Sequence, residues 1–475
     1  MHKLPDIKND FAGWYNDVVF QAELADHGPV RGTMVIRPYG YALWSEMQSV
    51  LDKKIKDTGH HNAAFPLLIP ESFLKKEAKH VEGFSPELAI VTHAGGKKLD
   101  EPLVVRPTSE TVIHYMFAKW LTSWRDLPIK INQWANVVRW ELRPRPFLRT
   151  TEFFWQEGHT AHATYQEADQ EAQLMMSEYV DFAQNYLAIP VITGVKTESE
   201  RFPGAEKTYT FEAIMPDDKG KALQMGTSHL LNQSFAQAFD MKFQDQDGAI
   251  KYPYLTSWGV TTRLIGATVM THGDDKGLAL PPKIAPIQLV MIPILKNNSN
   301  NQEVLDVVNR VAKELKQAGI RVHIDADDTK TPGAKFYKWE LKGVPLRMEI
   351  GPRDIQNGVA MLTDRLGIEK AAVPLDGITV KIQEKLQSIQ GELFNRAKAK
   401  LENSWFKAEK LAEFGPQMDE HGGLWQTGWC QNSACEQELR KYKAFSRCLL
   451  ETNHFKQCFY CENPSKGDLL VAKAY

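Results

Sequence analysis

The fold is decided by residues 137–159, which read VVRWELRPRPFLRTTEFFWQEGH. The pattern predicts two strands, at 129–141 and 151–159. The joining segment is too rich in proline, at Pro144 and Pro146, to be regular. The first strand carries Arg139 and Glu141. A single Arg-x-Glu on a strand is usually a surface ion pair of little consequence, so this stretch gains its weight from the segments around it.

The flanking segments predict regular elements on both sides of this stretch. Leu43, Met47 and Ile55 recur at helical spacing, so residues 41–58 are expected to form an amphipathic helix. Residues 65–69 predict a buried strand, and residues 108–110 open a helix toward residue 120. Thr164 and Glu167 form a capping box ahead of a long helix.

The rhythm of the chain changes after residues 280–286, where three prolines break any element. Residues 288–295 predict a strand, expected at a sheet edge because it contains a proline. Residues 302–318 predict a helix ended by Gly319, and helices and strands then alternate to about residue 376. A second boundary is expected near residue 390.

Composition sets the broad class. The chain has 475 residues, of which 43% are hydrophobic and 24% charged, as in a globular protein. The net charge of −2 predicts that any nucleic-acid surface is a local patch. The sequence shows neither an apolar leader region nor a run of eighteen apolar residues, so we expect a soluble cytoplasmic protein without membrane association.

All five cysteines lie after residue 429. Four of them form two close pairs with the spacing Cys430-x4-Cys435 and Cys458-x2-Cys461, which suits one tetrahedral zinc ion. The fifth cysteine, Cys448, belongs to neither pair and is not expected to bind the zinc ion. Because four sulfur ligands leave no open position, we expect a structural Zn²⁺ rather than a catalytic one.

The stretch at 137–159, together with Ser257-Trp258-Gly259-Val260-Thr261-Thr262-Arg263, resembles the second and third motifs of the class II aminoacyl-tRNA synthetases. Helix 41–58 followed by Pro66 resembles their first motif, which forms a homodimer. The resemblance implies ATP with Mg²⁺, and an arginine fork suits the phosphate and carboxylate that must meet. The implied ATP and catalytic residues are Arg139, Glu141, Arg149, Thr150, Phe153, Gln224, Thr227 and Arg263, with Glu212 as a magnesium ligand.

Further stretches resemble the prolyl-tRNA synthetase family in particular, among them residues 106–111, 155–159, 200–202 and 224–229. L-proline offers an ammonium, a carboxylate and an apolar ring. The resemblance implies a pocket with acids for the ammonium, Arg139 for the carboxylate and aromatic walls for the ring. The implied proline-binding residues are Thr108, Glu110, Arg139, Trp155, Glu157, His159, Phe202, His229, Ser257 and Gly259.

Residues 286–385 resemble the anticodon-binding domain of several class II synthetases. Basic residues outnumber acidic ones between Lys330 and Arg353, although such a run is more often a solvated helix face. Carboxylate and arginine side chains suit a guanine-rich anticodon of tRNA(Pro), and the candidates are Glu340, Arg347 and Asp354.

The expected fold is therefore an α+β catalytic domain with an antiparallel sheet (1–282), an α/β anticodon-binding domain (283–388) and a small α/β zinc-binding domain (389–475). About a hundred residues separate Glu157 from Thr256, too few for the editing insertion of bacterial-type relatives.

Two alternatives stay open. The first is another class II synthetase, for threonine or histidine. The absence of cysteine before residue 430 disfavours the catalytic zinc site of a threonyl enzyme, and the motifs at 106–111 and 155–159 disfavour a histidyl one. The second is an RNA-binding descendant without catalysis, which the presence of Arg139, Arg149 and Arg263 disfavours.

Overall fold

The computed structural model of the chain describes residues 3–75, 88–217, 220–295, 301–367 and 370–475. Its main feature is one sheet of eleven strands. In spatial order these are β20 (Trp405–Lys407), β21 (Leu424–Trp429), β23 (Gly467–Ala472), β22 (Phe445–Leu449), β9 (Ile192–Val195), β10 (Lys207–Ile214), β11 (Ala222–Asn232), β14 (Tyr254–Thr261), β8 (Glu152–His162), β7 (Ile129–Val138) and β3 (His61–Asn62). From β9 to β7 every neighbouring pair is antiparallel, which confirms the expected antiparallel catalytic sheet.

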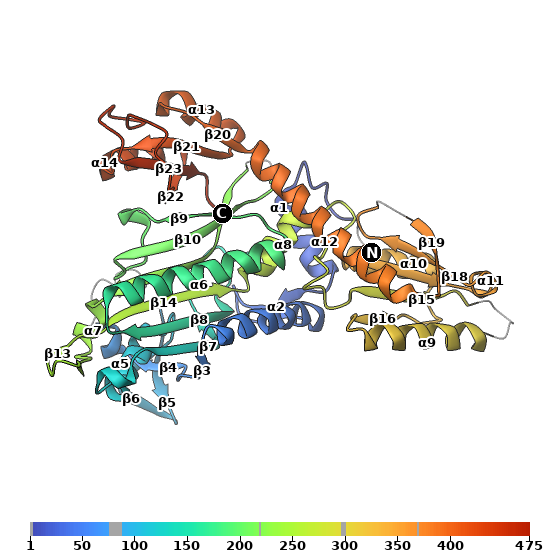
Figure 1. Cartoon of the computed structure of the whole chain (residues 1–475), viewed down its shortest axis with the longest axis horizontal. Coiled ribbons are helices and arrows are strands. Elements are labelled where there is room, and N and C mark those ends of the chain that lie inside the picture. The colour runs from blue at the N-terminus through green and yellow to red at the C-terminus, as the bar shows by residue number, and fades with distance from the viewer. Residues whose placement is uncertain (1–2, 76–87, 218–219, 296–300, 368–369) are drawn as a thin grey trace.

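Helices cover one face of this sheet (Figure 1). Of these, α6 (Tyr165–Asn185) and α8 (Arg263–His272) lie against its strands, while α2 (Pro38–Asp57) packs on α6 and α1 (Phe11–Gln21) packs on α8. The Thr164 side chain accepts from the Glu167 backbone amide, and the Glu167 side chain accepts from the Thr164 backbone amide, so the predicted capping box is present at the start of α6. Met175, Tyr179 and Phe182 of α6 are buried in the main core, because apolar residues at helical spacing form one stripe.

A three-stranded sheet and short elements complete the catalytic part. They are β4 (Leu68–Pro70), β6 (Lys97–Val105), β5 (Ala89–Ala94), β1 (Ala25–His27), β2 (Met34–Ile36), β12 (Phe243–Gln244), β13 (Ile250–Lys251), α3 (Glu71–Lys75), α5 (Glu110–Trp120) and α7 (Ser234–Ala238). The expectation of a buried strand at 65–69 was wrong in part. Phe65 and Ile69 are buried, but Leu67 and Leu68 are exposed and only β4 is a strand. Hydrophobicity alone did not distinguish the core face from the open one.

The second module is a five-stranded sheet with helices, as expected for an α/β domain. Its elements are β16 (Val322–Ile324), β15 (Leu289–Pro293), β17 (Leu346–Ile350), β18 (Val359–Asp364), β19 (Lys370–Pro374), α9 (Gln302–Gln317), α10 (Pro332–Leu341) and α11 (Pro352–Gln356). The expected edge position of β15 was wrong, because β15 lies between β16 and β17. Pro293 is tolerated since β16 pairs with β15 only as far as Met291.

The C-terminal module follows a single long helix, α12 (Ile378–Asn403), which passes through residue 389 without a break. It contains α13 (Leu411–His421), α14 (Ser433–Gln437) and the strands β20 to β23. Figure 1 shows β22 beside β9, where Leu449 pairs with Val195 and joins the module to the catalytic sheet. The last residue, Tyr475, returns to the catalytic part and donates its amide hydrogen to Ala222.

No helix among the described residues has the length and apolar character needed to cross a membrane.

Candidate active site

A cavity of 420 Å³ opens between the central strands and the loop that joins β7 to β8. Its lining contains every residue that the sequence assigned to ATP or proline, apart from Glu212. Motifs that follow β7 and lie on β8, β11 and β14 meet there because these strands are neighbours in the sheet. The expected strand 129–141 was too long: β7 ends at Val138, so Arg139 and Glu141 lie just beyond it. Polar groups that converge in a cavity of this size are typical of a small-molecule site.

Three arginines of the lining, Arg139, Arg149 and Arg263, lie near one another, because the charges of the first two act on the third; we call this part of the cavity its arginine end. The guanidinium of Arg139 lies 5.6 Å from the ring centre of Phe153 and 5.7 Å from that of Trp155, and its Nε donates to the Pro107 carbonyl oxygen. This contact fixes the side chain before any ligand arrives. An anion with several charges would suit this end.

Arg263 is enclosed by its neighbours, and in the described part of the chain its Nε is buried without a hydrogen-bond partner. Its Nη1 donates to the Gln224 carbonyl oxygen at 3.0 Å. Burial, followed by the charges of Arg149 and Arg139, lowers the pKa of Arg263 to about 10. Arg263 therefore remains charged at neutral pH, and an anionic ligand would relieve the repulsion among the arginines.

Two buried carboxylates, Glu110 and Glu157, lie away from the arginines, since Glu157 and His159 follow Phe153 and Trp155 along β8 and the charge of Glu110 acts on His159. The Thr108 hydroxyl donates to Glu110, whose side chain is buried. Glu157 accepts from Gln133 at 2.7 Å and lies 3.0 Å from His159 Nε2. Burial would lower the pKa of His159, but the hydrogen bond to Glu157 and the nearby carboxylate charges outweigh it and raise that pKa. This acidic end suits a cationic group.

Aromatic rings and buried polar atoms without hydrogen-bond partners also line the cavity. The rings of Phe202 and His229 stack with centres 4.5 Å apart. Burial lowers the pKa of His229 to about 4, so its ring is neutral at pH 7 and bonds to Thr208 and Thr227 at 3.0 Å each. Among the described residues, Trp155 Nε1 and Ser257 Oγ are buried without a hydrogen-bond partner, as expected for groups that await a ligand.

Glu212 does not fit the magnesium role that the sequence suggested. Its side chain is fully buried, with Oε1 2.8 Å from Lys196 Nζ and Oε2 2.6 Å from Arg447 Nη2. Two cations of the chain already occupy both carboxylate oxygens, so this carboxylate is committed to internal ion pairs. The sequence could not show this because Arg447 lies 235 residues away.

The three anticodon candidates lie in the second module, but each has an internal contact. Glu340 pairs with Lys276 at 3.2 Å. Arg347 lies over the Phe336 ring at 4.1 Å and pairs with Glu349. Asp354 accepts from the Gly351 amide at the start of α11.

The basic run around these candidates is not all surface. Lys335 is buried and donates to the Asp325 carbonyl oxygen. Lys342 is buried and pairs with Glu23. A charge count overstated the patch because amphipathic lysine stems can end in internal ion pairs.

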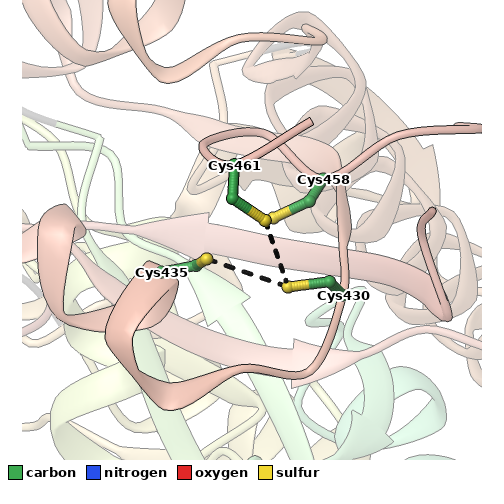
Figure 2. A group of neighbouring side chains, drawn as sticks. All are labelled: Cys430, Cys435, Cys458 and Cys461. Carbon is green, nitrogen blue, oxygen red and sulfur yellow. Dashed lines mark hydrogen bonds between the residues drawn. The ribbon is translucent and has the colours of Figure 1, made fainter. Parts of the chain in front are cut away.

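The four expected cysteines form one cluster in the C-terminal module (Figure 2). Their sulfur atoms lie within 4.8 Å of one another, and Cys430 Sγ lies 3.7 Å from Cys435 Sγ and 3.6 Å from Cys461 Sγ. Zn–S bonds of about 2.3 Å in a tetrahedron place sulfurs about 3.8 Å apart, whereas a disulfide needs about 2.05 Å. The donor set and spacing fit zinc. Cys448 lies elsewhere, packed beside Gly194 of the catalytic sheet.

Sequence reasoning missed two residues that hold the site together. Gln133 donates to Glu157, and Thr208 bonds to His229. Gln133 stands directly opposite Glu157 in the β7–β8 ladder. Pairing the two predicted strands in register could have found it. Thr208 carried no comparable signal.

Comparison with known proteins agrees with this geometry. Three family models match the chain: the tRNA synthetase class II core domain (G, H, P, S and T) at residues 92–272, the anticodon binding domain at 288–385, and the prolyl-tRNA synthetase C-terminal domain at 411–475. These matches confirm the resemblance inferred from the motifs.

Whole proteins match as well. The chain is 48% identical over 478 residues to Proline–tRNA ligase 2 of Clostridioides difficile, with 100% of this chain and 98% of that protein covered. It is 52% identical over 447 residues to Proline–tRNA ligase 2 of Rhodococcus jostii, with 93% and 91% covered.

Solved structures show the same shape. The crystal structure of prolyl-tRNA synthetase from Cryptosporidium parvum complexed with L-proline and AMP superimposes with a TM-score of 0.93, at 38% identity and with 100% and 99% of the two chains covered. The structure of that enzyme with halofuginone and AMPPNP gives 0.94, at 40% identity and 99% coverage of both chains. Full-length identity, the three matched domains and the shared fold together place this chain in the prolyl-tRNA synthetase family.

Proposed function

We propose that this chain is a proline–tRNA ligase, which activates L-proline with ATP and transfers it to the 3′ end of tRNA(Pro). The observation that carries the proposal is the division of one cavity into an arginine end and a carboxylate end. Arg139 lies over Trp155, which stands two residues before Glu157 on β8, so its guanidinium is placed where a carboxylate and an α-phosphate would meet.

Binding of proline follows from the acidic end. Glu110, oriented by Thr108, holds the ammonium, and Arg139 holds the carboxylate. The ring lies among the aromatic and histidine side chains that line the same cavity. The proposed proline site comprises Thr108, Glu110, Arg139, Trp155, Glu157, His159, Phe202, His229, Ser257 and Gly259.

Binding of ATP follows from the arginine end. Phe153 and Arg263 enclose the adenine, one by stacking and one by a cation–π contact. Glu141 accepts from the adenine amino group, and Arg149 holds the γ-phosphate. The proposed ATP residues are Arg139, Glu141, Arg149, Thr150, Phe153, Gln224, Thr227 and Arg263.

Activation is attack of a proline carboxylate oxygen on the α-phosphorus. The new O–P bond forms as the bond to pyrophosphate breaks, which leaves prolyl-adenylate. The Arg139 guanidinium stabilises the charge that gathers between the reacting groups. The terminal tRNA hydroxyl then attacks the activated carbonyl and releases AMP. We assign no side chain to Mg²⁺, since Glu212 does not fit; the ion enters only as the counter-ion of ATP.

The other modules serve the tRNA and stability. Residues 283–388 form the proposed anticodon-binding domain, with Glu340, Arg347 and Asp354 as reading residues that would exchange internal contacts for base contacts. Residues 389–475 form the zinc-binding domain, in which Cys430, Cys435, Cys458 and Cys461 hold a structural ion that ties loops together.

Residues 1–282 form the proposed catalytic domain. The described residues between Glu157 and Thr256 belong to the remainder of β8, to α6, to β9 through β14 and to their connections, without an inserted domain, so we propose no editing in cis. A cytoplasmic homodimer, with the first motif at its interface, completes the proposal.

The test is ATP–pyrophosphate exchange with the purified chain and each amino acid in turn, followed by aminoacylation of tRNA(Pro). Exchange should depend on L-proline. Exchange that depends on another amino acid, or no exchange with any, would contradict the proposal.

A further inference from the structure

Three buried charges lie on the seam between the catalytic sheet and the C-terminal module. Glu212 of β10 is fully buried, and the side chains of Lys196 and Arg447 are 2% and 6% exposed. Arg447 donates twice to Glu212 Oε2, from Nε at 3.0 Å and from Nη2 at 2.6 Å, while Lys196 donates to Oε1 at 2.8 Å. Two cations therefore face one carboxylate, with all three side chains buried.

Irregular backbone directs two of these side chains to each other. The β22–β23 ladder shifts register between Ser446 and Cys448, at Arg447. The β10–β11 ladder shifts between Phe211 and Glu212. Such bulges re-aim a side chain and are frequent next to active sites. The arginine and its partner are thus brought together by two separate departures from regular pairing.

The triad formed by Lys196, Glu212 and Arg447 is connected to the arginine end of the cavity through strand β11. Glu212 pairs with Gln224 across the β10–β11 ladder, and the Gln224 carbonyl oxygen accepts from Arg263. The charges of Glu212 and Arg447 also act on the pKa of Arg263, raising and lowering it respectively, after burial and the nearer arginines. A short path of contacts therefore leads from the C-terminal module to the proposed adenine site.

A purely structural seam would not need these charges. Burying ions carries a desolvation penalty, and well-packed hydrophobic residues often stabilise a protein as well or better. The rest of this seam includes a neutral donor, since the Thr197 hydroxyl donates to Glu436 at 2.6 Å. Glu436 is also buried, but the Thr197 and Ser446 hydroxyls donate to it, and the Arg440–Glu200 ion pair across the same seam is half-exposed. Among the described residues of the seam, Glu212 is the carboxylate that pairs with two buried cations.

We propose that Arg447, supplied by the C-terminal module, is a positioning residue for the ATP half of the site. It holds Glu212, and with it the β10–β11 ladder at Gln224, so that Arg263 stands in its binding position. It touches neither substrate. The inference rests on the proposed function only because the KM measurements need proline activation. The property that it predicts is the affinity for ATP.

The test uses the zinc-loaded full chain and measures KM for ATP and for proline separately, with ATP affinity by calorimetry. Arg447→Met should raise the ATP KM about tenfold and weaken ATP binding equally, while the proline KM stays within about twofold. Arg447→Lys keeps the charge and loses the double donation, so its ATP KM should rise less. Glu212→Gln should shift the ATP KM in the same direction as Arg447→Met.

Thr197→Val is the matched control, because it removes the hydrogen bonds of Thr197 to Glu436 and Ser446 across the same seam but none of the bonds to Glu212. It should leave both KM values unchanged. Equal effects of Thr197→Val and Arg447→Met, or a parallel rise of both KM values in Arg447→Met, would reduce Arg447 to a structural role and overturn the inference. If Arg447→Met does not fold, Arg447→Lys and Glu212→Gln decide, and wild-type ATP affinity in both overturns it.

Failure of the proposed function would look different. A wild-type chain that binds ATP and exchanges with an amino acid other than proline would contradict that function. The calorimetric comparison of wild type with Arg447→Met would still decide the inference.

Discussion

Replacement of Arg139 by methionine should nearly abolish proline-dependent pyrophosphate exchange. The guanidinium is held by Pro107 and by the rings of Phe153 and Trp155, so little reorganisation precedes the reaction. A unit charge about 4 Å from a carboxylate contributes about 4 kcal/mol at an effective dielectric constant of about 20. Removal of one pre-organised donor to developing charge costs about 3 to 4 kcal/mol in other enzymes. The rate should fall by a factor of about 10² to 10³.

The assay is pyrophosphate exchange at saturating ATP and proline, with thermal unfolding measured on the same samples. Arg139→Lys should recover only part of the loss, since an ammonium lacks the planar fork. Arg125→Met is the matched control: this arginine also lies over an aromatic ring, at 4.8 Å from Trp124, but outside the cavity. Exchange within about tenfold of wild type in Arg139→Met, a loss of only ~1.4 kcal/mol, would refute the assignment.

Four further predictions follow from the other parts of the chain. The purified protein should hold one zinc ion, which Cys458→Ser should lose and Cys448→Ser should keep in metal analysis; equal loss would mean that the wrong four ligands were chosen. Glu340→Ala and Arg347→Ala should raise the KM for tRNA in aminoacylation with little change in exchange, whereas an equal fall in exchange would point to folding. Burial lowers the pKa of His272 to about 4, against about 6.5 in the unfolded chain. The free energy of unfolding should therefore decrease as the pH falls from 6.5 toward 4, by about 2 kcal/mol at pH 5. In thermal melts His272→Gln should flatten this decrease, and an unchanged pH profile would contradict the prediction. Each methylene that alanine or cysteine lacks relative to proline costs only about 1 to 3 kcal/mol of binding free energy, so both amino acids should be charged onto tRNA(Pro) in vitro. Rapid enzyme-dependent hydrolysis of the mischarged product would reveal an editing site.

The sequence located the cavity well because its residues lie in short contiguous motifs on neighbouring strands. Arg139 and Trp155 stand on β7–β8 or just beyond it, and the later motif at Ser257 lies on β14, which pairs with β8. Each motif therefore brings several lining residues at once. The cysteine cluster was equally predictable, because four cysteines in two close pairs are typical of a structural zinc site.

The errors arose where a property depends on a distant partner. Lys335 and Lys342 were counted as surface charge, but their ammonium groups end on Asp325 and Glu23. Glu212 is another case, since its partner Arg447 belongs to a different module. No local pattern reports such pairings, because a charged residue shows the same letter whether it is solvated or buried in an ion pair. The same limit applied to β15, whose proline was taken to mark an edge strand.

The distribution of charge in the cavity would orient the two proposed substrates. An ammonium favours the end with Glu110 and Glu157, and a triphosphate favours the end with Arg149 and Arg263. In the proposed complex, a proline bound by its ammonium would present its carboxylate toward the arginines, where the α-phosphate would lie. Arg139, whose guanidinium lies over Phe153 and Trp155, is the proposed contact of both groups. Neither substrate needs to be recognised by shape alone, since the charge gradient orients each one and the approach of carboxylate to phosphate follows from the two orientations together.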